Sequence, residues 1–397
     1  MKRILFFSHS LALGGAERAL ISLLLNLDYS KYEVDLFLMR HCGELMGHIP
    51  ERVNLLPEIP QYACLAIPFV QVLKSGHFGV ALGRYIGKKR AYSYIRHHRL
   101  HENAVSLEYS HKYTLPFMPS IGNGEYDLAI SFLTPHYFVA EKVHAKKKAA
   151  WIHTDYSQLS VDRHSELSMW NEYNHIVGVS KDVVRSFVGV FPSLANRTIV
   201  IENTLSKTLI DKQAKAFSVE NEMPSDSNLN LLSIGRFTYA KNFDNVPDIC
   251  AHIRASGLPV KWYLIGYGSE ESLIRRKIAD AGMQKHVIIL GKKDNPYPYI
   301  SACDIYVQPS RYEGHSVTVR EAQLLRKPVV ITKYPTAMSQ LENGVDGVIV
   351  PMDNKGCAQE IVDLLQNHFK LEQIIDACTY RDYSMANEAY KIASLFS

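Results

Sequence analysis

Two glutamates eight positions apart, Glu313 and Glu321, flank the segment of this chain that is best suited to chemistry. The segment follows an apolar stretch, Ile305–Gln308, and its end has the pattern of a helix that runs from Glu321 to Lys327. Eight helical positions span about 12 Å, whereas two carboxyls that act on one glycosidic bond lie about 5–10 Å apart. The pair therefore suits one acid at each end of an extended ligand. The alternative is a solvated helix face with two ordinary surface acids.

Glycines and basic residues elsewhere suit the binding of phosphate. Gly14 and Gly15 follow an apolar stretch, and two glycines allow close approach to the backbone. The amphipathic segment Ala16–Leu27 is expected to form a helix, whose N-terminus attracts anions. In the second half Arg236 ends an apolar stretch, and Lys241 follows five residues later. Taken alone, each cation is most simply a solvent-facing loop residue, and the glycine pair a simple tight turn.

Four landmarks occur in the order typical of one enzyme family. They are residues 14–18, residues 235–237 with 241–242 behind them, residues 266–268, and residues 313–321. Together they resemble retaining GT-B glycosyltransferases of family four, the glycosyl transferases group 1, which include sucrose-phosphate, lipopolysaccharide and capsule enzymes. The resemblance covers essentially the whole chain. It implies an α/β fold of the GT-B type, with two doubly wound Rossmann-like domains facing across a cleft.

The resemblance implies roles for both acids and both cations. The leaving group of a nucleotide-diphospho-sugar is a diphosphate, so catalysis needs positive charge where negative charge develops. Arg236 and Lys241 are the residues implied for that diphosphate. Glu321 would accept two charge-assisted hydrogen bonds from the ribose hydroxyls, and Glu313 would contact the sugar near its reacting carbon.

Further contacts follow from the same resemblance. Gly14 and Gly15 would add a phosphate contact from the first domain and line the acceptor side. Asn203 matches a recurrent asparagine at the crossing between the domains and would lie near the phosphates. Backbone groups around Gly291 and Lys292 would recognise uracil or guanine.

Histidines complete the expected site. His153 ends a strand of the first half and resembles a histidine that faces the donor sugar, where a neutral imidazole can bond a hydroxyl or receive a proton. A structural histidine is the alternative. The N–H groups of Ser316 and Val317 would hold the sugar or phosphate. His315 would contact the donor or pack beneath the loop. The family usually has an aromatic residue or Leu, then often Gly, at positions 315 and 316, so the sugar is not indicated.

Composition indicates a soluble protein of two domains. A chain of 397 residues exceeds one ordinary core, and 47% hydrophobic with 21% charged residues is typical of globular proteins. No apolar run approaches the roughly 18 residues that span a bilayer. The basic start and apolar Ile4–Phe7 are expected to open a first strand, because no small-residue cleavage site of a signal peptide follows.

Six scattered cysteines form no C-x-x-C pair, which argues against a disulfide framework or zinc site and for a reducing compartment. We expect no cofactor and no metal site. We also expect a cytoplasmic location, either free or peripheral at the inner face of the cell membrane.

Strand-like stretches alternate with helical patterns along the chain, which favours parallel sheets covered by helices. Residues 1–205 are expected to form an acceptor-binding domain and 206–382 a nucleotide-sugar-binding domain, with a last helix in 383–397 packing back on the first. Polar residues 218–230 suggest an interdomain linker or exposed arm. The expected strands are 3–8, 34–39, 127–133, 149–153, 175–179, 198–201, 229–234, 260–265, 287–290, 305–308, 329–332 and 348–350.

The first half carries the net positive charge, with 22 Lys and Arg against 18 Asp and Glu in residues 1–205. Within it, Lys74–Lys112 holds eight cations against Glu102 and Glu108, with tyrosines and isoleucines interleaved. This pattern suits contact with an anionic membrane, and a solvated basic helix fits equally well. Nucleic-acid binding is not expected, because no recognition motif accompanies the charge.

The sequence thus predicts a retaining, metal-independent glycosyltransferase that uses a nucleotide-diphospho-sugar, with UDP as the expected nucleotide. The acceptor would be a glycan or lipid-linked chain in surface polysaccharide biosynthesis. The alternatives are a GT-B sugar-nucleotide epimerase or phosphorylase, and a non-catalytic partner protein with this fold. The glycine pair lacks the G-x-G-x-x-G spacing, which argues against a nicotinamide dehydrogenase.

Overall fold

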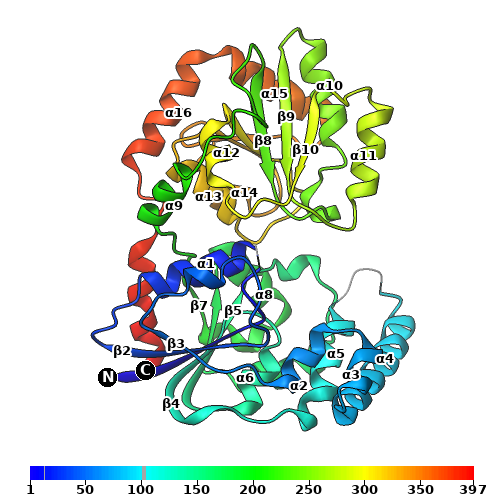
Figure 1. Ribbon diagram of the computed structural model, residues 1–397, viewed down its shortest axis with the longest axis vertical. Coiled ribbons are helices and arrows are strands. Elements are labelled where there is room, and N and C mark those ends of the chain that lie inside the picture. Colours follow the sequence, from blue (N-terminus) through cyan, green and yellow to red (C-terminus); the bar gives the residue numbers. More distant parts are fainter. Residues whose placement is uncertain (13, 101–103) are drawn as a thin grey trace. The chain divides into compact units, whose positions relative to one another are not determined.

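The computed structural model of the chain describes residues 1–12, 14–100 and 104–397, and it divides into two compact units (Figure 1). The first unit comprises Met1–Thr204 with Ala386–Ser397, and the second comprises Leu205–Met385. Within these residues no helix is both long enough and apolar enough to cross a membrane. All six cysteines are free.

A parallel sheet forms the core of the first unit. Over the described residues it has seven strands in the order β3-β2-β1-β4-β5-β6-β7. Ile4–Phe7 of β1 are fully buried, as expected for a parallel strand with helices on both faces. The strands are β1 (Lys2–Ser8), β2 (Tyr32–Leu38), β3 (Val53–Leu55), β4 (Ile121–Ser131), β5 (Val143–Ile152), β6 (His175–Gly178) and β7 (Thr198–Val200).

The helices of this unit connect or cover its strands (Figure 1). The α-helices are α1 (Gly15–Leu25), α2 (Pro60–Ala63), α3 (Phe69–Lys74), α4 (Phe78–His98), α5 (Val105–Thr114), α6 (His136–Lys142), α7 (Arg163–Trp170) and α8 (Lys181–Val190). The 3-10 helices are η1 (Met46–His48), η2 (Cys64–Ala66), η3 (Leu115–Phe117), η4 (Tyr156–Gln158), η5 (Pro192–Arg197) and η7 (Ala386–Phe396).

The second unit is built on another parallel sheet, with six strands over the described residues in the order β10-β9-β8-β11-β12-β13. Its strands are β8 (Leu229–Ile234), β9 (Val260–Ile265), β10 (Val287–Gly291), β11 (Ile305–Gln308), β12 (Val329–Thr332) and β13 (Val348–Val350). Its helices are α9 (Lys207–Ala214), η6 (Tyr239–Lys241), α10 (Val246–Ala255), α11 (Glu271–Asp280), α12 (Tyr297–Ala302), α13 (Val317–Leu324), α14 (Ala337–Gln340), α15 (Asn354–Gln366) and α16 (His368–Tyr380).

All twelve expected strands are present, and those of the second unit differ from their expected bounds by at most one residue. β4 and β5 each begin six residues earlier than expected. The prediction missed these residues because they are largely polar or glycine-rich and lack an apolar pattern. β3 was not expected. It has three residues with Asn54 at its centre, too few to form a recognisable strand pattern.

Two segments differ in kind from the expectation. Residues 218–230 are neither a free linker nor an exposed arm, because Val219 and Met223 are buried within the second unit. The C-terminal segment is a 3-10 helix, η7, rather than an α-helix. It belongs to the first unit, buries Ile392 and Leu395, and leaves Tyr390 exposed.

Candidate functional site

Two loops meet at the carboxyl edge of the second sheet, where its strand order reverses. β8 and β11 are neighbours there, and ligands of open α/β sheets bind beside such a reversal. The loop after β8 carries Arg236 and Lys241, and the loop after β11 carries Glu313. The fold therefore brings a cation and a carboxylate singled out in the sequence to one place.

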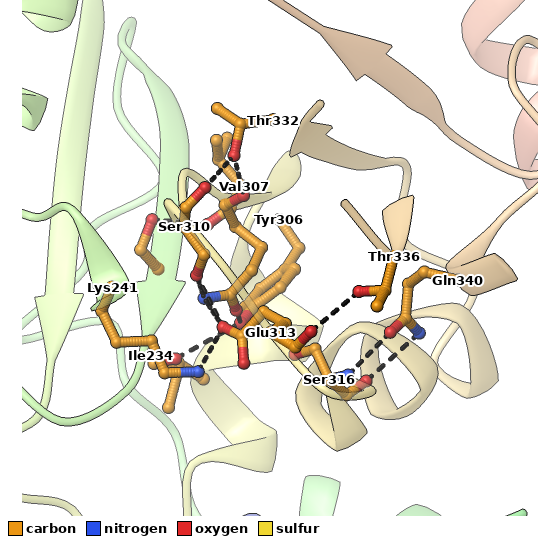
Figure 2. A network of polar contacts seen from close by, with 12 residues as sticks. Ile234, Lys241, Tyr306, Val307, Ser310, Glu313, Ser316, Thr332, Thr336 and Gln340 are labelled. Carbon is orange, nitrogen blue, oxygen red and sulfur yellow. Dashed lines mark hydrogen bonds and ion pairs between the residues drawn. The ribbon is translucent and has the colours of Figure 1, made fainter. Parts of the chain in front are cut away.

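Glu313 is held through one of its two oxygens (Figure 2). Its Oε1 lies 2.5 Å from Lys241 Nζ and accepts hydrogen bonds from the Ser310 hydroxyl at 2.6 Å and the Gln308 amide at 3.3 Å. Glu313 Oε2 makes no hydrogen bond within the described part of the chain. The lysine and glutamate side chains are 21% and 12% exposed. The carboxylate is thus oriented, with one oxygen left to accept a bond from a ligand.

Buried hydrogen bonds fix the loop after β11. Gln308 accepts a bond from the Tyr306 hydroxyl at 2.6 Å and donates to Ser310 Oγ at 2.8 Å. The Thr332 hydroxyl donates to the Ser310 carbonyl at 2.5 Å. All four residues are buried. Because a buried network in which each member is bonded resists rearrangement, the position of Glu313 is set before any ligand arrives.

A second set of contacts joins the two loops. Arg311 makes a bidentate ion pair with Asp244, at 2.9 and 2.8 Å, and donates to the Tyr239 carbonyl at 2.7 Å. Asn242 takes a left-handed conformation, with φ of 60°, and its amide donates to the Pro309 carbonyl at 2.8 Å. Bidentate arginine–carboxylate pairs add geometric specificity to their energy. These contacts fix Lys241 relative to Glu313.

The third landmark, residues 266–268, packs against the loop that carries Arg236. Gly266 has φ of +153°, and a Cβ added there would lie 1.9 Å from the Gly235 carbonyl oxygen. Its N–H donates to the Gly291 carbonyl at 2.9 Å. Only glycine permits this contact between backbones.

Replacing Gly266 with alanine is expected to lower the free energy of unfolding of the second unit by about 2–4 kcal/mol. The new Cβ would force the backbone at Gly235 to move, and alanine would also be strained at this φ. Gly257→Ala is the matched control, since Gly257 also has positive φ, +92°, but open space around its Cβ. Urea unfolding of both variants measures the difference. Equal losses would show that the contact with Gly235 contributes nothing.

Arg236 lies beside the ion pair without joining it. Its side chain is exposed and makes no hydrogen bond or ion pair with any residue that the structure describes. Lys241 and Glu313 together carry no net charge, and neither do Arg311 and Asp244. Arg236 is therefore a cation of this edge whose charge no ion pair among the described residues offsets.

Glu321 lies inside α13 and is fully buried. Its Oε1 accepts a hydrogen bond from the Tyr297 hydroxyl at 2.8 Å. The helix begins at Val317 rather than near Glu321, so residues 313–316 form a loop and the helical spacing of about 12 Å does not describe the pair. A ribose at Glu321 would have to replace or join the Tyr297 hydroxyl.

The residues that precede α13 are already bonded within the unit. The Ser316 N–H donates to Gln340 Oε1 at 2.7 Å, and the Gln340 amide donates to the Ser316 carbonyl at 3.3 Å (Figure 2). His315 Nε2 lies 3.5 Å from donors of Arg320 and Gln340. Its Nδ1 is therefore the protonated nitrogen, and it has no acceptor among the described residues. Burial, and then Arg320, lowers the pKa of His315 to about 3, so the ring is neutral.

The glycine pair of the first unit is not an open anion site. Gly14 caps α1, which begins at Gly15. A Cβ added at Gly14 would lie 1.9 Å from Glu17 Oε2, so the Glu17 carboxylate covers the start of the helix. Because a helix N-terminus favours negative charge, the chain itself provides the anion there. A phosphate contact would require Glu17 to move.

The remaining expected contacts are scattered. Asn203 lies between β7 and α9, and its Oδ1 is buried without a partner among the described residues. Gly291 ends β10 with φ of +73°. The Lys292 ammonium lies 5.5 Å from the centre of the Tyr267 ring.

His153 follows β5 in the first unit. Its Nε2 lies 3.0 Å from the Phe132 carbonyl. A carbonyl only accepts, so Nε2 carries the proton and Nδ1 is the acceptor. Burial lowers the pKa of His153 to about 4, which keeps the ring neutral at pH 7. The side chain can therefore accept a hydrogen bond through Nδ1.

The buried histidines predict a loss of stability in acid. Burial lowers the pKa of His153 to about 4 and that of His136 to about 3, from 6.5. At these two residues the unfolded chain therefore binds more protons between pH 6.5 and 3, and their contribution to the free energy of unfolding falls as the pH is lowered through this window. The raised pKa of Glu166, about 8, acts in the opposite direction near neutral pH. Urea midpoints at pH 6, 5 and 4 should therefore fall, less steeply for His136→Asn. The account fails if both proteins show the same slope.

Within the described residues, no group of three His, Cys, Asp or Glu is placed to hold a metal ion. Ser310, Arg311, Asp244 and Tyr297 were not predicted. Ser310 and Arg311 lie two and three residues after the end of an expected strand, and that position could have pointed to them. Asp244 and Tyr297 gave no comparable signal in the sequence.

Comparison with known proteins finds similarity to one enzyme family within the second unit. The model of the glycosyl transferases group 1 matches residues 215–379. The amylovoran biosynthesis glycosyltransferase AmsK of Erwinia amylovora is 28% identical over 145 residues, which is 34% of this chain and 35% of that protein. The lipopolysaccharide core biosynthesis glycosyltransferase LpsE of Rhizobium meliloti is 25% identical over 148 residues, 37% of this chain and 42% of that one. The chain thus matches less than half the length of either relative.

The fold of the whole chain is also found in a solved structure. HepE of Anabaena, in complex with UDP and glucose, superposes with a TM-score of 0.70 at 18% identity, covering 99% of both chains. The α/β fold with two Rossmann-like units is confirmed. The chain therefore has the GT-B fold, and residues 215–379 of its second unit resemble the glycosyl transferases group 1.

Proposed function

We propose that the chain is a retaining glycosyltransferase that transfers a hexosyl or N-acetylhexosaminyl group from a UDP-sugar to a glycan or lipid-linked acceptor. The pathway would be surface polysaccharide biosynthesis at the inner face of the cell membrane. The names of AmsK and LpsE, and the UDP bound by HepE, support this proposal. The observation that carries it is the arrangement of Arg236, Lys241 and Glu313 beside the reversal of the second sheet.

In the proposed reaction the bond between the sugar and the diphosphate breaks on one face of the sugar. The acceptor hydroxyl attacks that same face, and the departing phosphate oxygen takes the proton of the hydroxyl. Lys241 and Arg236 stabilise the charge that develops on the diphosphate. Glu313 Oε2 accepts a hydrogen bond from a hydroxyl of the donor sugar. We assign His153 Nδ1 a similar contact with the donor sugar.

We further propose that the reaction needs no metal ion, because the two cations can supply the positive charge that the leaving group requires. UDP release is expected to continue in excess chelator. Activity that is lost in chelator and restored by manganese would contradict this part of the proposal.

Thermal denaturation with UDP, GDP and uridine tests the donor assignment. UDP at about 100 times its Kd should stabilise the protein by about 2.7 kcal/mol, or about 5–10 °C in Tm for a unit of this size. Uridine should give much less, because it lacks the diphosphate. Equal shifts with uridine and UDP would contradict the proposal.

Release of UDP from a UDP-sugar would separate a transferase from a non-catalytic partner protein. A sugar nucleotide that changes in the absence of acceptor would indicate an epimerase.

The first unit exposes a surface suited to an anionic membrane. Positions 78, 82, 85, 89, 92 and 96 share one face of α4, by helical spacing. On the opposite face a Cβ at Gly87 would lie 2.7 Å from the Tyr109 carbonyl, so α4 packs closely on α5 there. The exposed set, here the α3–α4 surface, comprises Phe69, Val70, Leu73, Phe78, Leu82, Tyr85 and Tyr92 with Lys88, Lys89, Arg90 and Arg96.

Not every cation of Lys74–Lys112 belongs to that surface. Arg84 donates to the carbonyls of Cys64 and Ile67, and Lys112 donates to Ser165 Oγ. Glu102 lies outside the described residues. We propose that the α3–α4 surface binds the membrane, with its apolar side chains entering the headgroup region and its cations meeting anionic lipids.

Vesicle sedimentation tests this surface. The chain should bind vesicles with about 30% phosphatidylglycerol at least tenfold better than neutral ones, since each nearby cation adds about 1 kcal/mol. The triple change Phe78→Ser, Leu82→Ser and Tyr85→Ser should remove most binding. Phe369→Ser with Tyr380→Ser, exposed apolar residues of the second unit, is the control. Equal binding to both vesicle types would contradict the proposal.

A further inference from the structure

A cavity of about 170 Å³ lies within the first unit. It is bordered by the ends of β4 and β5 and by α5, α6 and α7. Because a buried water needs about 10–15 Å³ by this measure, the space suits about a dozen waters, comparable to the heavy atoms of one sugar ring. Leu107 and Thr154 of its lining are exposed, whereas Glu108 and Glu166 are buried. The two acids therefore lie deep in the cavity and the exposed residues at its mouth.

Aromatic side chains form much of the lining. Tyr137, Trp151, Tyr156 and Trp170 all border the cavity and are buried. Small-molecule sites typically combine such surfaces with a few placed polar groups that fix orientation. Flat apolar rings can stack against the faces of a sugar while its hydroxyls reach the polar groups.

Each acid has one oxygen that accepts no hydrogen bond from the described residues. Glu166 is 5% exposed, and its Oε2 accepts bonds from the Tyr156 hydroxyl at 3.1 Å and the Trp170 indole at 3.2 Å. Its Oε1 has no partner in the described part of the chain. Glu108 is 7% exposed, and its Oε1 accepts from the Tyr137 hydroxyl at 2.9 Å. Its Oε2 is buried without a partner among the same residues.

The buried Glu108 Oε2 calls for a donor from a ligand, because buried polar atoms are normally hydrogen-bonded, and Glu166 Oε1 offers a second acceptor. The charge of the cavity limits which ligand that can be. Its described lining contains two carboxyls and no lysine or arginine. Burial, and then the neighbouring acid, raises the pKa of Glu166 to about 8, and burial also raises the pKa of Glu108. The pair therefore keeps a proton near neutral pH and can both donate and accept, whereas an anion would contact no lysine or arginine in the described lining.

We propose that this cavity binds one uncharged, hydroxylated sugar ring, whose hydroxyls donate to Glu166 Oε1 and Glu108 Oε2. If the proposed transfer reaction holds, this ring is the end of the acceptor. Acceptors that end in a neutral sugar would then be used, and those that end in a uronate or a phosphate would be rejected. His153 lies on the same lining, which connects the cavity to a residue of the proposed reaction.

The full-length chain carries its own probe, because two of its three tryptophans, Trp151 and Trp170, line the cavity. We would titrate methyl α-D-glucopyranoside, methyl α-D-galactopyranoside, N-acetylglucosamine, glucosamine, glucuronate and glucose 6-phosphate against tryptophan fluorescence. At least one neutral sugar should give a saturable change with Kd of about 1–10 mM, a range typical of weak ligands. Glucuronate and glucose 6-phosphate should bind at least tenfold more weakly.

Glu166→Gln and Glu108→Gln should each weaken binding of the neutral sugar about tenfold. The bonds from Tyr156, Trp170 and Tyr137 hold the amide oxygen, so an NH2 group replaces the carboxyl oxygen that would accept from the ligand. Glu172→Gln, an exposed glutamate just beyond α7, is the matched control and should change nothing. UDP stabilisation should be the same in all three variants. If Glu166→Gln and Glu108→Gln do not fold, the comparison of neutral and anionic sugars on the wild-type chain still tests the inference.

Absence of saturable binding by any neutral sugar up to about 50 mM would overturn the inference, since such affinities are weaker than any specific site requires. Equal binding of glucuronate would also overturn it, and so would tighter binding of glucosamine, which would indicate an amine site. UDP stabilisation that persists in these cases would leave the proposed function standing. Absence of UDP stabilisation in the wild-type chain would instead contradict the proposed function.

Discussion

Replacing Lys241 with alanine is expected to lower kcat for UDP release from the preferred UDP-sugar by about 10²–10³-fold, the usual effect of removing one group that stabilises developing charge. Two losses combine in this variant. The diphosphate loses a cation, and Glu313 loses the ion pair that holds its Oε1 at 2.5 Å. Arg236 remains, so nucleotide binding should weaken less than turnover. Initial rates and a UDP titration separate the two effects.

Lys261→Ala is the matched control for that experiment. Lys261 also forms an ion pair in the second unit, with Asp226, and its side chain is 20% exposed, close to the 21% of Lys241. Losing this pair should cost at most about 1 kcal/mol of stability and leave kcat unchanged. The role assigned to Lys241 would be wrong if both variants lost activity equally, or if Lys241→Ala turned over normally.

Glu321→Gln is expected to weaken UDP binding about 10²-fold, because two hydrogen bonds to a charged acceptor contribute about 1.5–3 kcal/mol each. Binding of 2′-deoxy-UDP gives a readout that general destabilisation would not produce. The wild-type chain should prefer UDP over the deoxy form at least tenfold, and Glu321→Gln should lose most of that preference. Isothermal titration with both nucleotides measures it.

Tyr297→Phe is the informative control for Glu321. The hydroxyl of Tyr297 occupies Glu321 Oε1 in this structure. Removal of this hydroxyl should leave UDP affinity unchanged or raise it, since the ribose would no longer compete with the hydroxyl for the Glu321 carboxylate. Unchanged preference between UDP and 2′-deoxy-UDP in Glu321→Gln would show that this acid does not bind the ribose.

Much of the fold could be predicted because its signals are local. Short, largely apolar runs predicted the bounds of β8, β9 and β11, and their alternation with helical patterns predicted parallel strands. β3 was not predicted because three residues form no recognisable pattern. The first residues of β4 and β5 were not predicted because they pair with each other without the apolar side chains that mark a buried strand.

The proximity of Lys241 and Glu313 could be predicted from the sequence, but the contacts around them could not. Lys241 and Glu313 each follow a strand, and the sheet order brings those strand ends together. The ion pair of Arg311 with Asp244 joins residues 67 positions apart. The bond that covers Glu321 comes from Tyr297 on another helix. Hydrogen bonds and ion pairs between residues this far apart depend on tertiary packing, which local sequence patterns do not predict.

The carboxylate of Glu17 changes how the first unit must be understood. Gly14 and Gly15 alone suggested a phosphate site, but the third residue after Gly14 is the acid that folds back on it. A glutamate at this position is a common partner of a helix start. In the proposed reaction the positive charge for a diphosphate therefore comes from Arg236 and Lys241.

A structure of the chain with UDP bound tests this central claim most directly. The account predicts that the diphosphate oxygens lie within hydrogen-bond distance, about 2.7–3.2 Å, of Lys241 Nζ and the Arg236 guanidinium. Glu313 should keep its contacts with Ser310 and Gln308. A nucleotide bound elsewhere, with both cations directed away from its phosphates, would contradict the account.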